Sequence, residues 1–138
     1  MATGTRRRGR EAALQMLYLM DVSGGSVEQA IAAYYEYLAA NRDGEDFARA
    51  LVRGWAEHRE EVDGRIRQVS QHWRLERMSW VDRNILRLGT HELLHLDDVP
   101  RRVTLNEAVE LAKRFGAEGS PGFVNGVLDR IAADLGKA

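Results

Sequence analysis

The sequence contains no cysteine and only two prolines among its 138 residues. Without cysteine the chain cannot form a disulfide, a thiolate metal site or a cysteine nucleophile. It also lacks an apolar run of membrane-spanning length, and its charged N-terminus has no apolar signal segment. We therefore expect a cytoplasmic protein. Its length can bury about two-thirds of the unfolded surface, which suits one domain over residues 1–138.

Phosphate-binding loops, dinucleotide fingerprints and a strand–turn–helix context for a nucleophilic serine are absent as well. Strand-type alternation is not sustained anywhere, whereas apolar residues recur at helical spacing along most of the chain. We therefore predict an all-α fold of about seven helices joined by short links. Three pairs have the spacing of a capping box and mark predicted helix starts: Ser26 with Gln29, Ser79 with Asp82, and Thr104 with Glu107.

The apolar pattern predicts further boundaries and contacts. The first helix is expected to run from about Thr5, its N-cap, to Asp21. A long apolar stripe over residues 47–73 predicts a helix that bends or breaks near His58. Gly89, on a broad apolar face, would let a neighbouring helix approach closely. The second helix is expected to bury four side chains: Ile31, Tyr34, Tyr37 and Leu38.

Four arginines stand in five consecutive positions near the start of the chain, at Arg6, Arg7, Arg8 and Arg10. The whole chain has 20 Lys and Arg against 21 Asp and Glu, a net charge of -1. This local concentration of positive charge indicates a binding site for a polyanion. Cations in the first turn of a helix oppose its dipole, so helix stability does not explain them. The structural alternative is a solvated basic tail.

The segment His91-Glu92-Leu93-Leu94-His95 matches the His-Glu-x-x-His pattern of zinc peptidases. A catalytic zinc also needs a third protein ligand, and the extended pattern has Asp98 and Arg101 at its Gly and His positions. No downstream glutamate is singled out, and His58 and His72 are expected to pack or to lie at the surface. We interpret both histidines of the motif as the polar margin of a helix without a metal, and keep a zinc hydrolase as a competing hypothesis.

Phe123 is expected at the third position of the first turn of the last helix, which Ser120 would cap and Pro121 would begin. It lies roughly 100° from Val124 and therefore at the edge of the buried face. A helix start attracts phosphate, and an exposed aromatic ring stacks on an unpaired base. Phe123 is thus a candidate RNA contact, with a partly buried packing residue as the structural alternative.

Three segments of the sequence resemble the signatures of the NusB family of transcription antitermination factors. One covers residues 10–18 and opens the chain; the others, residues 106–113 and 123–129, lie towards its end. Their order and separation match those of the family, and the likeness spans the whole chain. Glu92 and Leu93 also fit the family's central helix, which accounts for part of the zinc-like pattern.

The resemblance implies two packed three-helix bundles, no enzymatic activity and no cofactor. It implies binding to single-stranded boxA-type RNA of nascent ribosomal RNA transcripts, together with the ribosomal protein NusE, in a complex with RNA polymerase and other Nus factors. It also implies RNA contacts at the first helix and at the connection into the last one: Arg6, Arg7, Arg8, Arg10, Glu118, Gly119, Ser120 and Phe123. The implied NusE contacts lie around the start of the central helix: Glu76, Trp80, Asp82 and Arg83.

Two of these positions are unusual. Gly119 stands where many family members carry an acidic residue, which puts its RNA contact in doubt, and Trp80 is either a partner anchor or local packing. A NusB-like module also begins a family of ribosomal-RNA cytosine methyltransferases, so the RNA-binding fragment of such an enzyme is an alternative. A generic helical interaction scaffold is a further alternative, which RNA binding would distinguish.

Overall fold

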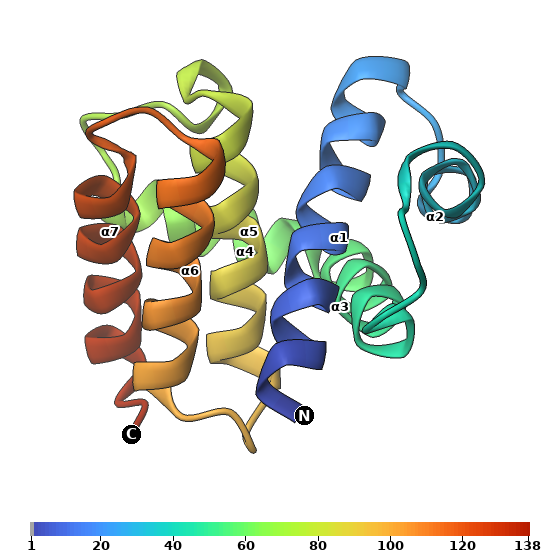
Figure 1. Ribbon diagram of the computed structural model, residues 1–138. Helices are drawn as coiled ribbons and strands as arrows, with labels where there is room; N and C mark the ends of the chain where they lie inside the picture. Colours follow the sequence, from blue (N-terminus) through green and yellow to red (C-terminus); the bar gives the residue numbers. More distant parts are fainter. Residues whose placement is uncertain (1) are drawn as a thin grey trace. The chain divides into compact units, whose positions relative to one another are not determined.

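The computed structural model describes residues 2–138, with side chains from residue 4 onward. This part of the chain is helical without any strand, so the all-α prediction is confirmed (Figure 1). The elements are α1 (Ala2–Ser23), α2 (Val27–Ala33), the π-helical turn η1 (Tyr34–Leu38), α3 (Glu45–Glu57), α4 (Arg59–Val69), the 3-10 turn η2 (Leu75–Arg77), α5 (Trp80–His95), α6 (Arg101–Phe115) and α7 (Ser120–Leu135).

The elements form two compact units, the first ending at Glu57 and the second running from His58 to Ala138. In the first unit, α1 packs against both α2 and α3. In the second, α5 contacts α4, α6 and α7, and α5, α6 and α7 lie side by side in Figure 1. Helix α5, which contains Gly89, is therefore central within the second unit. No described helix has both the length and the hydropathy needed to cross a membrane.

Several predicted boundaries are confirmed by local hydrogen bonds. Ser26 forms a complete capping box with Gln29, and the Ser79 hydroxyl accepts a hydrogen bond from the Asp82 N–H at 3.1 Å. The predicted break falls at His58, whose backbone angles (φ -115°, ψ 23°) separate α3 from α4. At these places a short-range pattern was enough to locate the helix end.

Helix α1 begins earlier than predicted. It starts at Ala2, so Thr5 lies inside the helix and is not its N-cap. The arginines at positions 6–8 therefore lie in the second turn, where the unfavourable effect of the helix dipole is smaller than in the first. The segment Ala2-Thr3-Gly4-Thr5 contains only one strong helix former, so local propensity does not explain this early start.

The end of the second predicted helix is also different. Residues 34–38 form a π-helical turn, which takes more residues per turn than an α-helix and rotates the following side chains off the apolar face. As a result Ile31 is buried, Tyr34 is half-buried, and Tyr37 and Leu38 are exposed. Burial of Tyr37 and Leu38 was therefore a wrong prediction.

Two further predictions failed for reasons of tertiary packing. Thr104 is not a cap: α6 starts at Arg101 after Pro100, and the buried Thr104 hydroxyl donates to Oε1 of Glu92 at 3.2 Å. Trp73 does not continue the apolar stripe, because α4 ends at Val69 and the indole is 64% exposed. The spacing of Thr104 and Glu107 is compatible with a helix cap and also with two positions inside a helix. The hydrogen bond from Thr104 to Glu92 favours the position inside the helix.

Glycine substitutions test the packing around α5. A Cβ on Gly89 would lie 2.7 Å from Cδ1 of the buried Leu128, whereas a Cβ on Gly64 of α4 would meet nothing within 4 Å. We expect Gly89→Ala to lower the free energy of unfolding by about 1–3 kcal/mol through overpacking. Gly64→Ala should raise it by about 0.5–1 kcal/mol through helix propensity. Urea unfolding of both variants measures this, and equal shifts would contradict close packing at Gly89.

Candidate nucleic-acid interface

Two glycines hold the arginine-rich part of α1 against the loop before α3. Gly44 has a left-handed backbone (φ +73°), and a Cβ there would lie 2.6 Å from the backbone nitrogen of Gly9. A Cβ on Gly9 would in turn lie 2.9 Å from the carbonyl oxygen of Gly44. Only glycine at both positions allows this approach without a backbone shift. The contact brings Asp43 and Phe47 close to the arginines.

The four arginines divide into two environments. Arg6 and Arg10 are one helical turn apart, and both guanidinium groups lie over the ring of Phe47, at 4.9 and 5.1 Å from its centroid. Arg10 is only 3% exposed, whereas Arg6 is half-buried. The predicted direct RNA contact by Arg10 is therefore not supported by its position. We interpret Arg10 as a residue that packs α1 onto Phe47.

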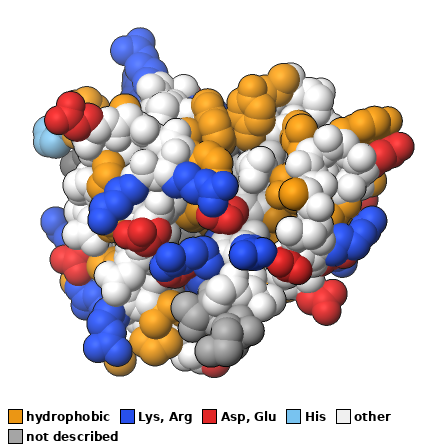
Figure 2. Space-filling view, in the orientation of Figure 1, with side chains coloured by type: hydrophobic (Ala, Val, Ile, Leu, Met, Phe, Trp, Pro, Cys, Tyr) orange, Lys and Arg blue, Asp and Glu red, His pale blue; other side chains and the backbone are white. Residues whose placement is uncertain are grey.

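Arg7 and Arg8 are exposed and are the two arginines best placed to meet a phosphate. Nη1 of Arg8 forms an ion pair with Oδ2 of Asp43 at 2.6 Å, with both side chains more than half exposed. Exposed ion pairs contribute little to stability, so a phosphate can replace Asp43 at small cost. On the face drawn in Figure 2, Lys and Arg side chains lie among Asp and Glu side chains.

A surface hollow adjoins the arginines in the first unit. Besides Thr5, Arg6 and Phe47 it is lined by Arg42, which the sequence analysis did not single out. Arg42 binds Glu45 through Nη1 at 2.9 Å from each carboxylate oxygen, and these contacts lower the pKa of Glu45. The hollow therefore combines two guanidinium groups and an aromatic ring with an ionised carboxylate.

The turn into α7, in the second unit, contains the other predicted RNA contacts. Glu118 and Gly119 are exposed, but Ser120 is 4% exposed and does not cap α7. Its hydroxyl accepts a hydrogen bond from the N–H of Ala117 at 3.1 Å and so closes the turn between α6 and α7. Ser120 thus shapes the turn, and its predicted direct RNA contact is not supported by its burial.

Phe123 is half-buried at the edge of α7, as predicted, but it is the fourth helical residue and not the third, because α7 begins at Ser120. Its backbone N–H donates to the carbonyl oxygen of Gly119 at 3.1 Å and is therefore already used within the helix. Its ring lies edge-on to the indole of Trp73, with the centroids 6.1 Å apart and the planes at 75°. Trp73 is 64% exposed, and the two rings form an aromatic pair next to the α6–α7 turn. Sequence reasoning assigned Trp73 to a helical stripe, and only the packing of residues so far apart in the chain shows its place beside Phe123.

The predicted partner contacts lie at η2 and the first turn of α5. Glu76 is exposed and pairs with Arg67 at 2.8 Å, which lowers the pKa of the Glu76 carboxyl group. Trp80 and Arg83 are half-buried, and Nη1 of Arg83 donates to the carbonyl oxygen of Met78 at 3.2 Å. Asp82 is half-buried as well, and its buried Oδ1 makes no hydrogen bond within the described chain. Buried carboxylate oxygens normally have a hydrogen-bond partner, so the lone Oδ1 is unusual. Because this oxygen has almost no solvent-accessible surface, a group from outside the chain would reach the carboxylate through the exposed part of the half-buried residue.

The zinc-like motif has a different environment from the one predicted. His91 and Glu92 are 3% and 2% exposed, so they are not at the polar margin of α5; His95 is exposed. Oε1 of Glu92 accepts the hydroxyl hydrogen of Thr104, which turns this carboxylate towards α6. His58 supplies the third imidazole that the sequence analysis did not find. Burial lowers the pKa of His91 to about 4, with smaller contributions from His95 and His58, so His91 is neutral at pH 7.

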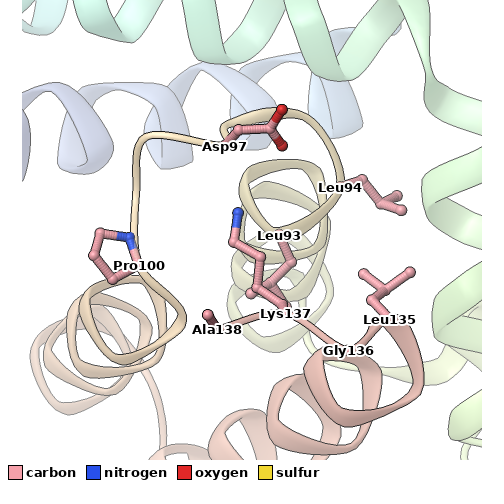
Figure 3. Close-up of a pocket in the computed structure, with 8 residues that line it drawn as sticks. All are labelled: Leu93, Leu94, Asp97, Pro100, Leu135, Gly136, Lys137 and Ala138. Atoms are coloured by element: carbon pink, nitrogen blue, oxygen red, sulfur yellow. The ribbon is translucent and has the colours of Figure 1, made fainter.

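Another hollow lies at the C-terminal end of the second unit (Figure 3). Lys137 crosses it, and its Nζ donates to the carbonyl oxygen of Leu96 at 2.9 Å. The N–H of Arg101 donates to the carbonyl oxygen of Ala138 at 2.8 Å. These bonds hold the C-terminal residues against the loop between α5 and α6. No predicted site residue lines this hollow, so we assign it no part in the interface.

Comparisons with known proteins agree along nearly the whole chain. The model of the NusB family matches residues 7–133. The transcription antitermination protein NusB of Sorangium cellulosum (strain So ce56) is 52% identical over 134 residues, which cover 97% of this chain and 96% of the relative. A structure of T. maritima NusB matches with a TM-score of 0.83 at 41% identity, covering 94% of this chain and 91% of that one. A crystal structure of antitermination factors NusB and NusE in complex with dsRNA matches with a TM-score of 0.81 at 31% identity, covering 94% and 97%.

Proposed function

The chain belongs to the NusB family, and from this membership we propose that it binds boxA-type RNA of nascent ribosomal RNA transcripts together with a NusE-type protein. It acts in the cytoplasm, on RNA polymerase and alongside other Nus factors, to suppress premature termination. Its match over nearly the whole length of an antitermination protein carries this proposal. The resolved NusB–NusE–dsRNA complex supports binding to both RNA and the partner.

The competing hypotheses receive less support. The relative that matches along 96% of its own length is an antitermination protein, which disfavours the methyltransferase fragment and agrees with the prediction of a non-enzymatic protein. A zinc hydrolase of the His-Glu-x-x-His type needs Glu92 as general base. In the structure Glu92 is buried and bound to Thr104, so it does not face a metal-bound water.

The RNA surface that we propose has two parts, one in each unit. In the first, Arg7 and Arg8 contact phosphates, with Arg6 beside them on the ring of Phe47. In the second unit, the exposed turn residues Glu118 and Gly119 lie along the RNA strand. The aromatic pair of Phe123 and Trp73 stacks on one of its bases. A Cβ on Gly119 would meet nothing within 4 Å, so the missing acidic side chain leaves open space for RNA.

Salt dependence tests the phosphate contacts. The double variant Arg7→Ala/Arg8→Ala should weaken binding to a boxA-type single strand across sequences. It should also lower the magnitude of the slope of log K against log salt by roughly 0.7 per lost contact. Fluorescence anisotropy titrations at several salt concentrations measure both quantities.

The matched control is Arg102→Ala/Arg130→Ala, which removes the same charge from exposed positions on α6 and α7. It should leave the slope nearly unchanged. If the two double variants change the slope equally, Arg7 and Arg8 act only through the net charge. If Arg7→Ala/Arg8→Ala leaves the salt slope unchanged, the two arginines make no phosphate contact and belong to a solvated basic segment.

A further inference from the structure

The second unit contains a cluster of three imidazoles that RNA binding does not explain. We propose that His58, His91 and His95 bind one divalent transition-metal ion, Zn²⁺ or an ion of similar ligand preference. One ring nitrogen from each histidine lies within 4.8 Å of the others. Three imidazoles are a common ligand set for Zn²⁺, which leaves a fourth position for water or a carboxylate.

The distances require only a local rearrangement of side chains. Two nitrogens bound to one tetrahedral zinc at its usual bond length are about 3.4 Å apart. The rings of His58 and His95 are now stacked, with centroids 3.8 Å apart and planes at 21°, so they must rotate to direct their lone pairs at one ion. His95 is exposed and His58 is half-buried, so neither ring is fully enclosed by protein.

The buried His91 is a second, independent observation. Its Nδ1 is buried and has no hydrogen-bond partner within the described chain. Buried ring nitrogens in native proteins nearly always have a partner, and an exception calls for an explanation. A metal ion in the cluster, or a water molecule that it holds, would supply the missing partner.

The surroundings of the cluster suit a cation. Nε2 of His95 lies 2.8 Å from Oε1 of Glu61, so a carboxylate stands directly beside the imidazoles. Carboxylates often orient metal-bound histidines and complement the charge of the ion. The backbone that places the ligands is held by Arg87 of α5, whose Nε and Nη2 bind the carboxylate of Asp63 on α4 at 3.0 and 3.1 Å.

The metal that we infer has a structural role. His58 precedes α4, whereas His91 and His95 belong to the last turns of α5, so the ion would link the start of one helix to the end of the other. Glu92 is turned away towards Thr104 and supplies no base for hydrolysis. Imidazole ligands suit Zn²⁺, Co²⁺, Ni²⁺ and Cu²⁺ better than Mg²⁺ or Ca²⁺, which prefer oxygen.

Zinc titration of the chelator-stripped full chain tests this proposal. Calorimetry should show one Zn²⁺ per chain, and zinc should raise the melting temperature by several degrees, because a ligand that binds only the folded state stabilises it. His95→Gln should weaken zinc binding at least tenfold, and Glu61→Gln should weaken it roughly 10- to 100-fold. Both residues are exposed, so these variants are expected to fold.

The matched control is His72→Gln, which removes the one histidine outside the cluster, also at an exposed position. It should bind zinc as the unaltered chain does. Co²⁺ adds a spectroscopic readout, because its visible absorption reports ligand type and geometry. The proposal is overturned if zinc binds equally well to His95→Gln and the unaltered chain, or does not bind at all. RNA affinity should be unchanged by chelator, which keeps this test separate from that of the proposed function.

Discussion

Asp82→Lys is expected to abolish the gain in RNA affinity that the NusE-type partner provides. Asp82 lies in the first turn of α5, and its buried Oδ1 has no hydrogen-bond partner within the described chain. If a basic group of the partner binds this carboxylate, reversing its charge leaves that group unpaired against a lysine. Losses of this kind cost about 2–5 kcal/mol, or roughly 30-fold and more in affinity. Titrations of labelled RNA with and without the partner measure the effect, while RNA binding by the isolated variant should be nearly unchanged.

Two control variants separate the partner contact from helix capping. Ser79→Ala removes the hydroxyl that accepts the Asp82 N–H and should cost about 1 kcal/mol of stability without weakening partner binding. Asp97→Lys makes the same charge change at an exposed position beyond the other end of α5. If Asp82→Lys lowers stability as Ser79→Ala does and the partner still binds, Asp82 serves only the helix and the interface lies elsewhere.

This proposed arrangement explains why RNA recognition would be shared between this chain and the NusE-type partner. The chain has a net charge of -1 and, of its four clustered arginines, only Arg7 and Arg8 are exposed. Few phosphate contacts give a modest intrinsic affinity that falls steeply with salt. A partner that carries positive charge along the same strand adds contacts and raises the effective concentration of each site.

Short-range chemistry made much of the fold predictable. The sequence shows where a serine can accept a hydrogen bond from the N–H three residues later and so cap a helix. Ser26 and Ser79 both cap helices at the expected positions. A glycine on a broad apolar face indicates close approach, and Leu128 packs against Gly89. These features depend on neighbours within one turn or on the face of one helix.

Several of the errors arose where distant residues decide the outcome. The sequence groups Arg10 with its neighbours, whereas in the structure its guanidinium group lies over the ring of Phe47, in the region where Gly9 and Gly44 allow close contact. His58 was expected to pack or to lie at the surface, because nothing in its local sequence connects it with His91. Periodicity describes one helix at a time, so it does not show which side chains two helices bring together.

Phe123→Ala is expected to reduce RNA affinity by about 1–3 kcal/mol, or roughly 5- to 150-fold. The ring is half-buried at the edge of α7 and lies nearly perpendicular to the indole of Trp73, so its exposed part is the part that would meet a base. Trp73→Ala should give a loss of similar size, and the double variant should lose less than the sum, because the two rings support each other. Stacking involves no phosphate, so the salt slope should be unchanged, unlike that of Arg7→Ala/Arg8→Ala.

Thermal unfolding separates base stacking from packing. Val124→Ala removes two methyl groups from the fully buried side chain that follows Phe123 and should lower stability with RNA affinity nearly unchanged. Phe123→Ala should show the opposite balance, with a large loss of affinity and a smaller change in melting temperature. If Phe123→Ala instead unfolds as easily as Val124→Ala and still binds RNA normally, the ring is a packing residue. The base would then have to stack on Trp73 alone, which Trp73→Ala tests directly because that indole is 64% exposed.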